Sequence, residues 1–473
     1  MPAPKILAVA IALAFSTPLA VRAQNPADLE EIRKQIQELK DAYESRMQAL
    51  EKRLKSAEDA AGAAQEKAKQ AEAKAEAAPA PAAAPAGKQA SINAFNPAIS
   101  LILMGTYGNF KNDPTQYSIT GLQPPGATTP GDRGFSLGES ELFITANVDH
   151  VFMGAMNLAL LPDNTISVEE AYFQTLGLGY GLTLKGGRFF SAIGYQNSIH
   201  AHAWDFVDTS LVQRAFLGDN YGDDGVQLTW VAPLPLFVEV GGELGRGSGL
   251  AGTFQDGELV DNDRNKNGIG AGTAFLHVGG DVGDSNAYRV GLSYLSTNTG
   301  TNVFPLADFD TTNGGTNTFT NANIRLYGVD FVWKWAPHGN YQYQNFKFVA
   351  EWFQLHREGD LTSDVTGTAT TDRFSQRQSG WYVQGAYQFH PYWRVGLRYD
   401  QLQPGSLDAG LNSALTVPDY KPKRYSAMID WNPSEFSRIR LQYNEDKSVQ
   451  NLTDHQIFLQ YIFSLGTHGA HKF

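Results

Sequence analysis

Histidine motifs give the first candidate chemistry in this chain of 473 residues, which contains ten histidines. His200 and His202 form a His-Ala-His triplet, and Asp205 and Asp208 follow shortly after. Side chains two residues apart in an extended chain point the same way, and imidazole and carboxylate groups are good zinc ligands. The spacing therefore predicts a weak, incomplete zinc site. The alternative is that these side chains pack and hydrogen-bond within their loop.

Two further stretches have the spacing of metal ligands. His468 and His471 form a His-x-x-His pair near the C-terminal end, which predicts either zinc binding or a solvated tail. Asp261, Asp263, Asn265 and Asn267 stand at alternate positions before Gly268, in the manner of a calcium loop. Lys266 and Gly272, however, stand where an EF-hand needs Gly and Glu. An Asn/Asp-rich surface loop is therefore the favoured interpretation of this stretch.

Composition excludes several other functions. The absence of cysteine excludes disulfides and thiol chemistry. Neither the His-Glu-x-x-His zinc-protease motif nor the phosphate-binding Gly-x-x-x-x-Gly-Lys-[Ser/Thr] motif occurs. The formal net charge of −12 disfavours a nucleic-acid partner. We expect a protein that is not an enzyme, that requires no cofactor and that binds zinc or calcium weakly, if at all.

The C-terminal stretch 454–473 indicates the fold. Ile457, Leu459 and Tyr461 alternate with residues of the opposite face, and the chain ends on Phe473. A period of two is typical of a strand whose faces meet different solvents. The stretch predicts the closing strand of a transmembrane β-barrel, with an edge strand of a soluble sandwich as the alternative.

Amphipathic strands continue through most of the chain, separated by connections of two alternating lengths. A mean hydropathy of −0.31 suits a barrel, in which only alternate residues need be apolar. The pattern predicts a 16-stranded antiparallel transmembrane β-barrel over 99–473. The sixteen expected strands are 100–110, 135–148, 152–161, 166–176, 182–191, 225–231, 236–246, 273–281, 287–297, 323–335, 345–356, 379–389, 393–401, 424–431, 437–444 and 455–465.

Alternation also assigns the faces of these strands. Side chains that alternate with apolar residues should face the lumen, and those with charge are Lys347, Glu351, Arg394, Arg398, Arg438 and Arg440. Aromatic residues gather near the short turns, where a girdle at the membrane interface is expected. They are Trp333, Trp335, Tyr387, Tyr392, Trp393 and Trp431.

The first hundred residues differ from the rest. Residues 1–23 read as a signal peptide, with a retained membrane anchor as the alternative. Residues 24–78 carry an apolar heptad pattern, which predicts an α-helical coiled-coil arm between subunits in the periplasm; a lone Ala-rich helix is the alternative. Residues 79–98 form a Pro/Ala-rich linker.

Signal peptide, coiled coil, linker and sixteen strands together resemble the phosphate-selective porin family of Gram-negative outer membranes. The resemblance implies a homotrimer in the outer-membrane lipid, with the third long loop folded into each lumen. It also implies that lumenal Arg residues select anions, and the matching residues are Arg394, Arg398, Arg438 and Arg440.

The third long loop, 192–224, is acidic and favours a different selectivity. Asp205, Asp208 and other carboxylates outnumber Arg214. An acidic loop opposite an Arg-bearing wall predicts a transverse field that admits zwitterions or cations. Three functions follow: a passive channel for small solutes or divalent metal such as zinc, an anion channel, and a structural tether through the arm to peptidoglycan or other envelope components.

Overall fold

The computed structural model describes residues 97–122, 128–247, 268–299, 302–305, 316–365, 368–412 and 416–466. The chain divides into two compact units, Met1–Gly87 and Lys88–Phe473. The expected signal peptide, coiled-coil arm and nearly all of the linker lie outside the described residues. The 261–268 loop, His468 and His471 lie outside them as well, except for Gly268. Among the helices in the described ranges, none has the length and apolar character needed to cross a membrane.

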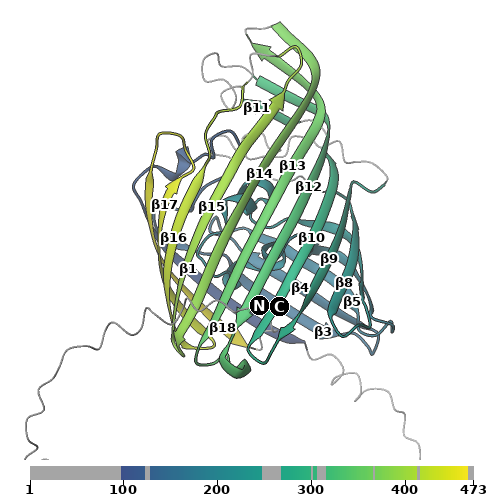
Figure 1. Cartoon of the computed structure of the whole chain (residues 1–473), viewed down its shortest axis with the longest axis vertical. Helices are drawn as coiled ribbons and strands as arrows, with labels where there is room; N and C mark the ends of the chain where they lie inside the picture. Colours follow the sequence, from purple (N-terminus) through teal and green to yellow (C-terminus); the bar gives the residue numbers. More distant parts are fainter. Residues whose placement is uncertain are drawn as a thin grey trace, which may run out of the picture. The chain divides into compact units, whose positions relative to one another are not determined.

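Strands account for most of the second unit, and they form one antiparallel sheet of eighteen segments within the described ranges (Figure 1). Their bounds are β1 (Ala98–Phe110), β2 (Gly134–Leu137), β3 (Ser140–Asn147), β4 (Phe152–Leu160), β5 (Ile166–Thr175), β6 (Leu182–Phe190), β7 (Gly222–Val231), β8 (Phe237–Gly245), β9 (Ala271–Val282), β10 (Asn286–Thr299), β11 (Asn302–Pro305), β12 (Thr316–Trp335), β13 (Asn345–Val365), β14 (Thr368–His390), β15 (Trp393–Asp408), β16 (Lys423–Ser434), β17 (Ser437–Lys447) and β18 (Asp454–Gly466).

The sheet closes into a barrel because β18 pairs with β1, from Ser100 opposite Gly466 to Phe110 opposite Gln456. Segments β2 and β3 both pair with β1, and β10 and β11 both pair with β12. Each of these two pairs serves as one barrel strand, so the eighteen described segments make sixteen strands. The strand count, antiparallel order and closure predicted from the sequence are confirmed.

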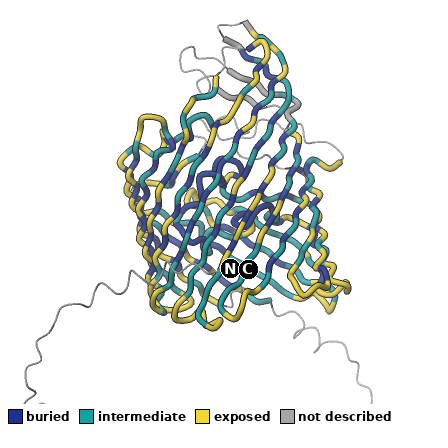
Figure 2. Tube along the Cα trace, in the orientation of Figure 1, coloured by how far each residue is buried: buried dark blue, intermediate teal, exposed yellow. Residues whose placement is uncertain are grey.

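The outer wall is apolar and the inner wall is mostly polar. Figure 2 shows buried and exposed positions alternating along the strands. On β18, Ile457, Leu459 and Tyr461 are exposed, whereas the intervening Phe458 and Gln460 are buried inside. Each large apolar side chain left in water forgoes roughly 1.5–3 kcal/mol of burial free energy. A wall with dozens of them is stable only against lipid, and it is the wall of a transmembrane barrel.

Strands β12 to β15 are longer than the sequence pattern predicted. We expected strands to end at 356 and to resume at 379, but β13 and β14 continue to Val365 and from Thr368. Apolar alternation fades there and Thr, Ser and Asp take over, so the lipid-facing signal stops while the ladder hydrogen bonds continue. The extension rises above the rest of the barrel rim (Figure 1).

The connection between β6 and β7, residues 191–221, is here called the inward loop. It contains the 3₁₀ turns η2 (Gln196–Ser198) and η3 (Ala201–Ala203) and the helix α3 (Leu211–Leu217). Ser210 begins α3 by accepting a hydrogen bond from the Gln213 amide, and Gly218 ends it in a left-handed conformation. The inward loop folds into the barrel (Figure 1), as the family resemblance implied.

Candidate functional site

The inward loop fills one side of the lumen with an apolar core. Its buried apolar side chains pack against the inner faces of β10 and of β12 to β15. The loop contributes Ile193, Tyr195, Leu211, Val212, Ala215, Phe216 and Leu217, and the wall contributes Leu295, Ile324, Leu326, Val349, Phe353, Leu355, Tyr382 and Leu402. On the opposite side of the lumen, β1, β2 and β5 to β7 line a cavity.

Asp205 anchors the middle of the loop to the wall. Its carboxylate pairs with Lys347 Nζ at 2.6 Å and with Arg394 Nη1 at 2.7 Å. Arg394 also pairs with Asp430 at 2.6 Å, and Arg440 pairs with the same Asp430 at 2.7 Å. Arg394, Arg440 and Lys347 face inward as expected, but each is paired with a carboxylate.

Asp208 anchors the loop a second time, at a site that is almost fully buried. Its carboxylate lies 2.7 Å from both Arg398 Nη2 and Arg424 Nη1. It also accepts hydrogen bonds from the side chains of Gln442 at 2.7 Å and Asn444 at 3.0 Å. Burial alone would raise the pKa of Asp208, but Arg424 and Arg398 outweigh it and hold that pKa well below its usual value. The carboxylate is therefore charged.

The remaining charged residues predicted for the lumen occupy different positions. Arg438 reaches the Trp204 carbonyl at 3.5 Å and lies 3.9 Å from Asp430. Arg214 is buried on α3 and pairs with Asp219 at 3.3 Å. The expected acidic loop and Arg-bearing wall do meet. Because they meet as ion pairs, most of the charge is neutralised where they touch.

Glu351 on β13 holds the inward loop at two points, near its start and in α3. Its carboxylate accepts the Tyr195 amide at 2.5 Å and the Gln213 side-chain amide at 3.0 Å, and Tyr382 donates to it at 2.5 Å. Gly194 precedes this contact with φ of +70°, and a Cβ there would lie 2.4 Å from Glu351 Oε1. Only glycine fits this close approach.

Gly194→Ala should therefore loosen the loop. A left-handed non-glycine residue costs about 1–2 kcal/mol, and the overlap with Glu351 adds to that cost. Gly179→Ala is the matched control, since Gly179 has φ of +78° with nothing near its Cβ position. We expect hydrogen exchange at the Tyr195 and Gln196 amides to accelerate in the Gly194 variant alone. Equal protection in both variants would contradict this role.

Two cavities open toward opposite ends of the barrel, and residues of the inward loop line the first of them but not the second. The first, of about 620 Å³, opens toward the long connections and is lined by seven carboxylates and two Arg residues. They are Asp132, Glu139, Glu169, Asp208, Asp219, Asp223, Asp224, Arg188 and Arg214. The second, of about 590 Å³, lies at the short turns, with Lys334, Lys347 and Arg394 against Asp281 and Asp284.

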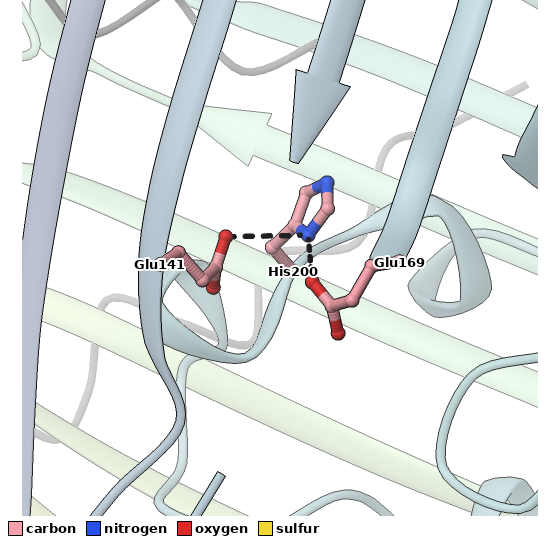
Figure 3. Close-up of side chains that lie close together, drawn as sticks. All are labelled: Glu141, Glu169 and His200. Atoms are coloured by element: carbon pink, nitrogen blue, oxygen red, sulfur yellow. Dashed lines mark hydrogen bonds and ion pairs between the residues drawn. The ribbon is translucent and has the colours of Figure 1, made fainter. Parts of the chain in front are cut away.

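A cluster of Glu and His residues borders the first cavity. Glu141 Oε2 and Glu169 Oε2 lie 3.4 Å and 3.2 Å from His200 Nδ1 (Figure 3). Glu170 lies 3.0 Å from the other ring nitrogen of His200. His202 Nδ1 lies 2.6 Å from Glu141 Oε1. Ligand atoms of Glu141, Glu169 and His200 all lie within 4.8 Å of one another, which suits a metal ion.

A β-bulge explains how two consecutive glutamates reach one imidazole. Neighbouring strand residues normally point to opposite faces. The β4–β5 register shifts after Asn157, so that Asn157 opposes Glu170 while Leu158 opposes Val168, and Glu169 is the extra residue. The bulge turns Glu169 toward the lumen beside Glu170. It therefore brings both carboxylates to His200.

The structure rearranges the predicted His-Ala-His site. His200 and His202 lie on a 3₁₀ turn rather than an extended chain, and their ring centroids are 5.9 Å apart. Asp205 and Asp208 bind Lys and Arg residues instead of joining the histidines. The sequence analysis missed Glu141, Glu169 and Glu170. They lie 30 to 61 residues before the histidine that each contacts, and no local signal links them to His200 or His202.

The stretch from Gly134 to Gly138 has the Gly-x-Ser-x-Gly spacing of hydrolase nucleophiles and was overlooked in the sequence. That motif needs a sharp strand-to-helix turn to present its serine. Here the stretch runs through β2, an extended strand hydrogen-bonded to β1. The stretch therefore gives no support to a hydrolase.

Comparison with known proteins identifies one sequence relative and several solved structures of outer-membrane β-barrels. No protein-family model matches the chain. An uncharacterized protein of Aquifex aeolicus (strain VF5) is 32% identical over 405 residues, covering 81% of each chain. The outer membrane channel DcaP of Acinetobacter baumannii is 12% identical with a TM-score of 0.47, covering 78% of this chain and 97% of that chain. The anion-selective porin from Comamonas acidovorans is 8% identical with a TM-score of 0.45, covering 78% and 99%.

Proposed function

The chain belongs to the same family as the Aquifex aeolicus protein, and we propose that it is an outer-membrane porin through which small hydrophilic solutes diffuse passively. The observation that carries this proposal is a lipid-facing barrel with a mostly polar lumen and a cavity toward each end of the barrel.

The lining of the first cavity supports a preference for cations. Carboxylates outnumber the two Arg residues there, even when Asp208, which Arg398 and Arg424 neutralise, is left out. Low-dielectric walls concentrate the field of such a surplus and raise the local concentration of cations. The Arg residues of the expected anion ladder contribute little, because Arg394, Arg398 and Arg440 are neutralised by carboxylates.

The reversal potential in a planar bilayer under a potassium chloride gradient tests this preference. We expect the purified protein to reverse on the cation side. Replacing Asp132 and Asp224 together with Asn should move the reversal potential toward zero, since both residues line the first cavity. The shift should be largest at low salt, because the screening length is about 10 Å at 0.1 M.

Asp163→Asn is the control for charge, since Asp163 lies in the nearby β4–β5 connection and is not part of the cavity lining. This variant should reverse at the potential of the unmodified protein. A reversal on the anion side in the unmodified protein would refute the cation preference. An absence of conductance in a correctly folded barrel would refute the porin itself.

An anion-selective channel is the alternative, and the second cavity favours it through Lys334, whereas Lys347 and Arg394 in the same lining are paired with Asp205. Selectivity for phosphate would appear as block of the current by phosphate. The homotrimer and the tether to peptidoglycan stay predictions. Deleting 24–78 should leave conductance intact and weaken the envelope if the arm is a tether, and should dissociate trimers if it is the subunit coiled coil.

A further inference from the structure

The cluster around His200 has the geometry of a closed metal site. We propose that Glu141, Glu169 and His200, joined by Asn157, bind one divalent ion of the zinc class and thereby fix the inward loop to the barrel wall. Glu141 lies on β3, Asn157 on β4, Glu169 on β5 and His200 on the loop. The ion would therefore join three neighbouring strands to the loop. The binding site exists independently of what the pore conducts.

Distances among the ligand atoms agree with tetrahedral zinc. Bonds of about 2.0–2.1 Å in a tetrahedron place neighbouring ligand atoms about 3.3 Å apart. His200 Nδ1 lies 3.4 Å from Glu141 Oε2 and 3.2 Å from Glu169 Oε2. The ligand atoms of Glu141, Glu169 and His200 all lie within 4.8 Å of one another, so these residues can supply three corners of the tetrahedron.

Asn157 supplies the fourth corner. Its side-chain nitrogen donates to Glu141 Oε2 at 2.6 Å and to Glu169 Oε2 at 3.1 Å, and lies 3.0 Å from His200 Nδ1. The same amide has a buried oxygen, Asn157 Oδ1, without a hydrogen-bond partner, although the residue is only 1% exposed. An orphaned buried acceptor costs about 1–3 kcal/mol. Rotating the amide by half a turn would give that oxygen a metal partner.

Surrounding groups hold the imidazole in the orientation that a metal requires. Glu170 Oε2 lies 3.0 Å from His200 Nε2 and can accept its proton, which leaves the Nδ1 lone pair directed at Glu141 and Glu169. Carboxylates commonly orient metal-binding histidines in this way. His202 performs a corresponding role for Glu141, through its contact with Oε1 at 2.6 Å.

The donor set favours zinc over calcium and magnesium. Calcium needs six to eight oxygen ligands and magnesium an octahedron, whereas this cluster offers one imidazole nitrogen, two carboxylates and one amide. Imidazole nitrogen is a good ligand for zinc and other late divalent metals. The ion would also neutralise carboxylate charge that otherwise lies crowded at the edge of the first cavity.

Zinc titration of the full-length protein tests the site, using a chain in which His468 and His471 are both replaced with Ala. After treatment with a chelator, isothermal titration calorimetry with zinc chloride should show one ion per chain. X-ray absorption spectroscopy at the zinc edge should show one imidazole among oxygen ligands. His200→Asn and Glu169→Gln should each abolish stoichiometric binding. Glu170→Gln should weaken it about 10–100-fold, as expected for an orienting group.

Two further variants make the outcome decisive. Asn157→Asp should bind zinc more tightly, because it offers a carboxylate oxygen with no amide rotation. His277→Asn is the matched control, since His277 forms a similar buried pair with Glu239 at 2.9 Å elsewhere in the barrel. It should bind zinc like its parent. Binding that survives both His200→Asn and Glu169→Gln, or an absence of binding in the folded parent, would overturn the proposal.

Discussion

Replacing Asp208 with Ala should release the inward loop and give a channel that conducts more current and fluctuates between levels. Asp208, Arg398 and Arg424 are each at most 5% exposed, so the loop is held by a fully desolvated ion pair. Breaking such a pair costs about 3 kcal/mol or more. A change of that size shifts the balance between docked and released loop more than a hundredfold.

Other carboxylates near Arg398 and Arg424 explain why the barrel should stay folded in the Asp208→Ala variant. Arg398 and Arg424 retain Asp400, at 3.1 Å and 3.5 Å, and Arg424 also lies 4.0 Å from Asp446. The wall therefore stays balanced while the loop loses its partner. Asp408→Ala is the control, since Asp408 lies at the exposed end of β15, the strand that carries Arg398. This variant should leave single-channel recordings unchanged. Identical conductance in the two variants would show that Asp208 does not hold the loop.

Glu351→Gln should have a comparable effect through hydrogen bonds rather than ion pairs. The carboxylate accepts from the Tyr195 amide, Gln213 and Tyr382, and a carboxamide can accept with only one of its two heavy atoms. Each buried donor left without a partner costs about 1–3 kcal/mol. We expect exchange of the Tyr195 amide hydrogen to accelerate, and the barrel to unfold at a lower temperature.

Glu358→Gln is the control for this substitution. Glu358 lies on the same β13 strand with a side chain that is 46% exposed, and it pairs with His356 and, at 3.7 Å, with Arg325. Exposed pairs of this kind contribute about 0–1 kcal/mol. Hydrogen exchange measured by mass spectrometry should separate the two variants. Similar exchange of the loop amides in both would contradict the anchoring role of Glu351.

Strand pattern was sufficient to predict the barrel. A period of two over lipid-facing residues is local information, and it located all sixteen strands and the inward direction of Lys347, Glu351 and Arg394. The extensions of β13 and β14 were missed for the same reason. Beyond the membrane, nothing forces one face to be apolar, so the pattern disappears although the hydrogen-bonded ladder continues.

The candidate site could be predicted only in part. His200 was singled out by its spacing from His202, but its partners Glu141 and Glu169 depend on strand register and on the bulge at Glu169. Neither the strand register nor the bulge can be predicted from a local sequence motif. The pairing of Asp205 with Arg394, 189 residues apart, likewise requires the loop to be placed inside the barrel first. Residue types indicated the chemistry, whereas topology determined which groups meet.

The distant anchors of the inward loop have a consequence for assembly. Its contacts with Glu351, Arg398 and Arg424 join residues more than 130 positions apart, so the loop can dock only after the second half of the chain has formed its strands. Contacts between residues so far apart in the sequence form slowly. A one-residue slip of β15 or β16 would also turn their Arg side chains toward lipid. The inward loop can therefore dock only in a barrel whose β15 and β16 strands have the correct register.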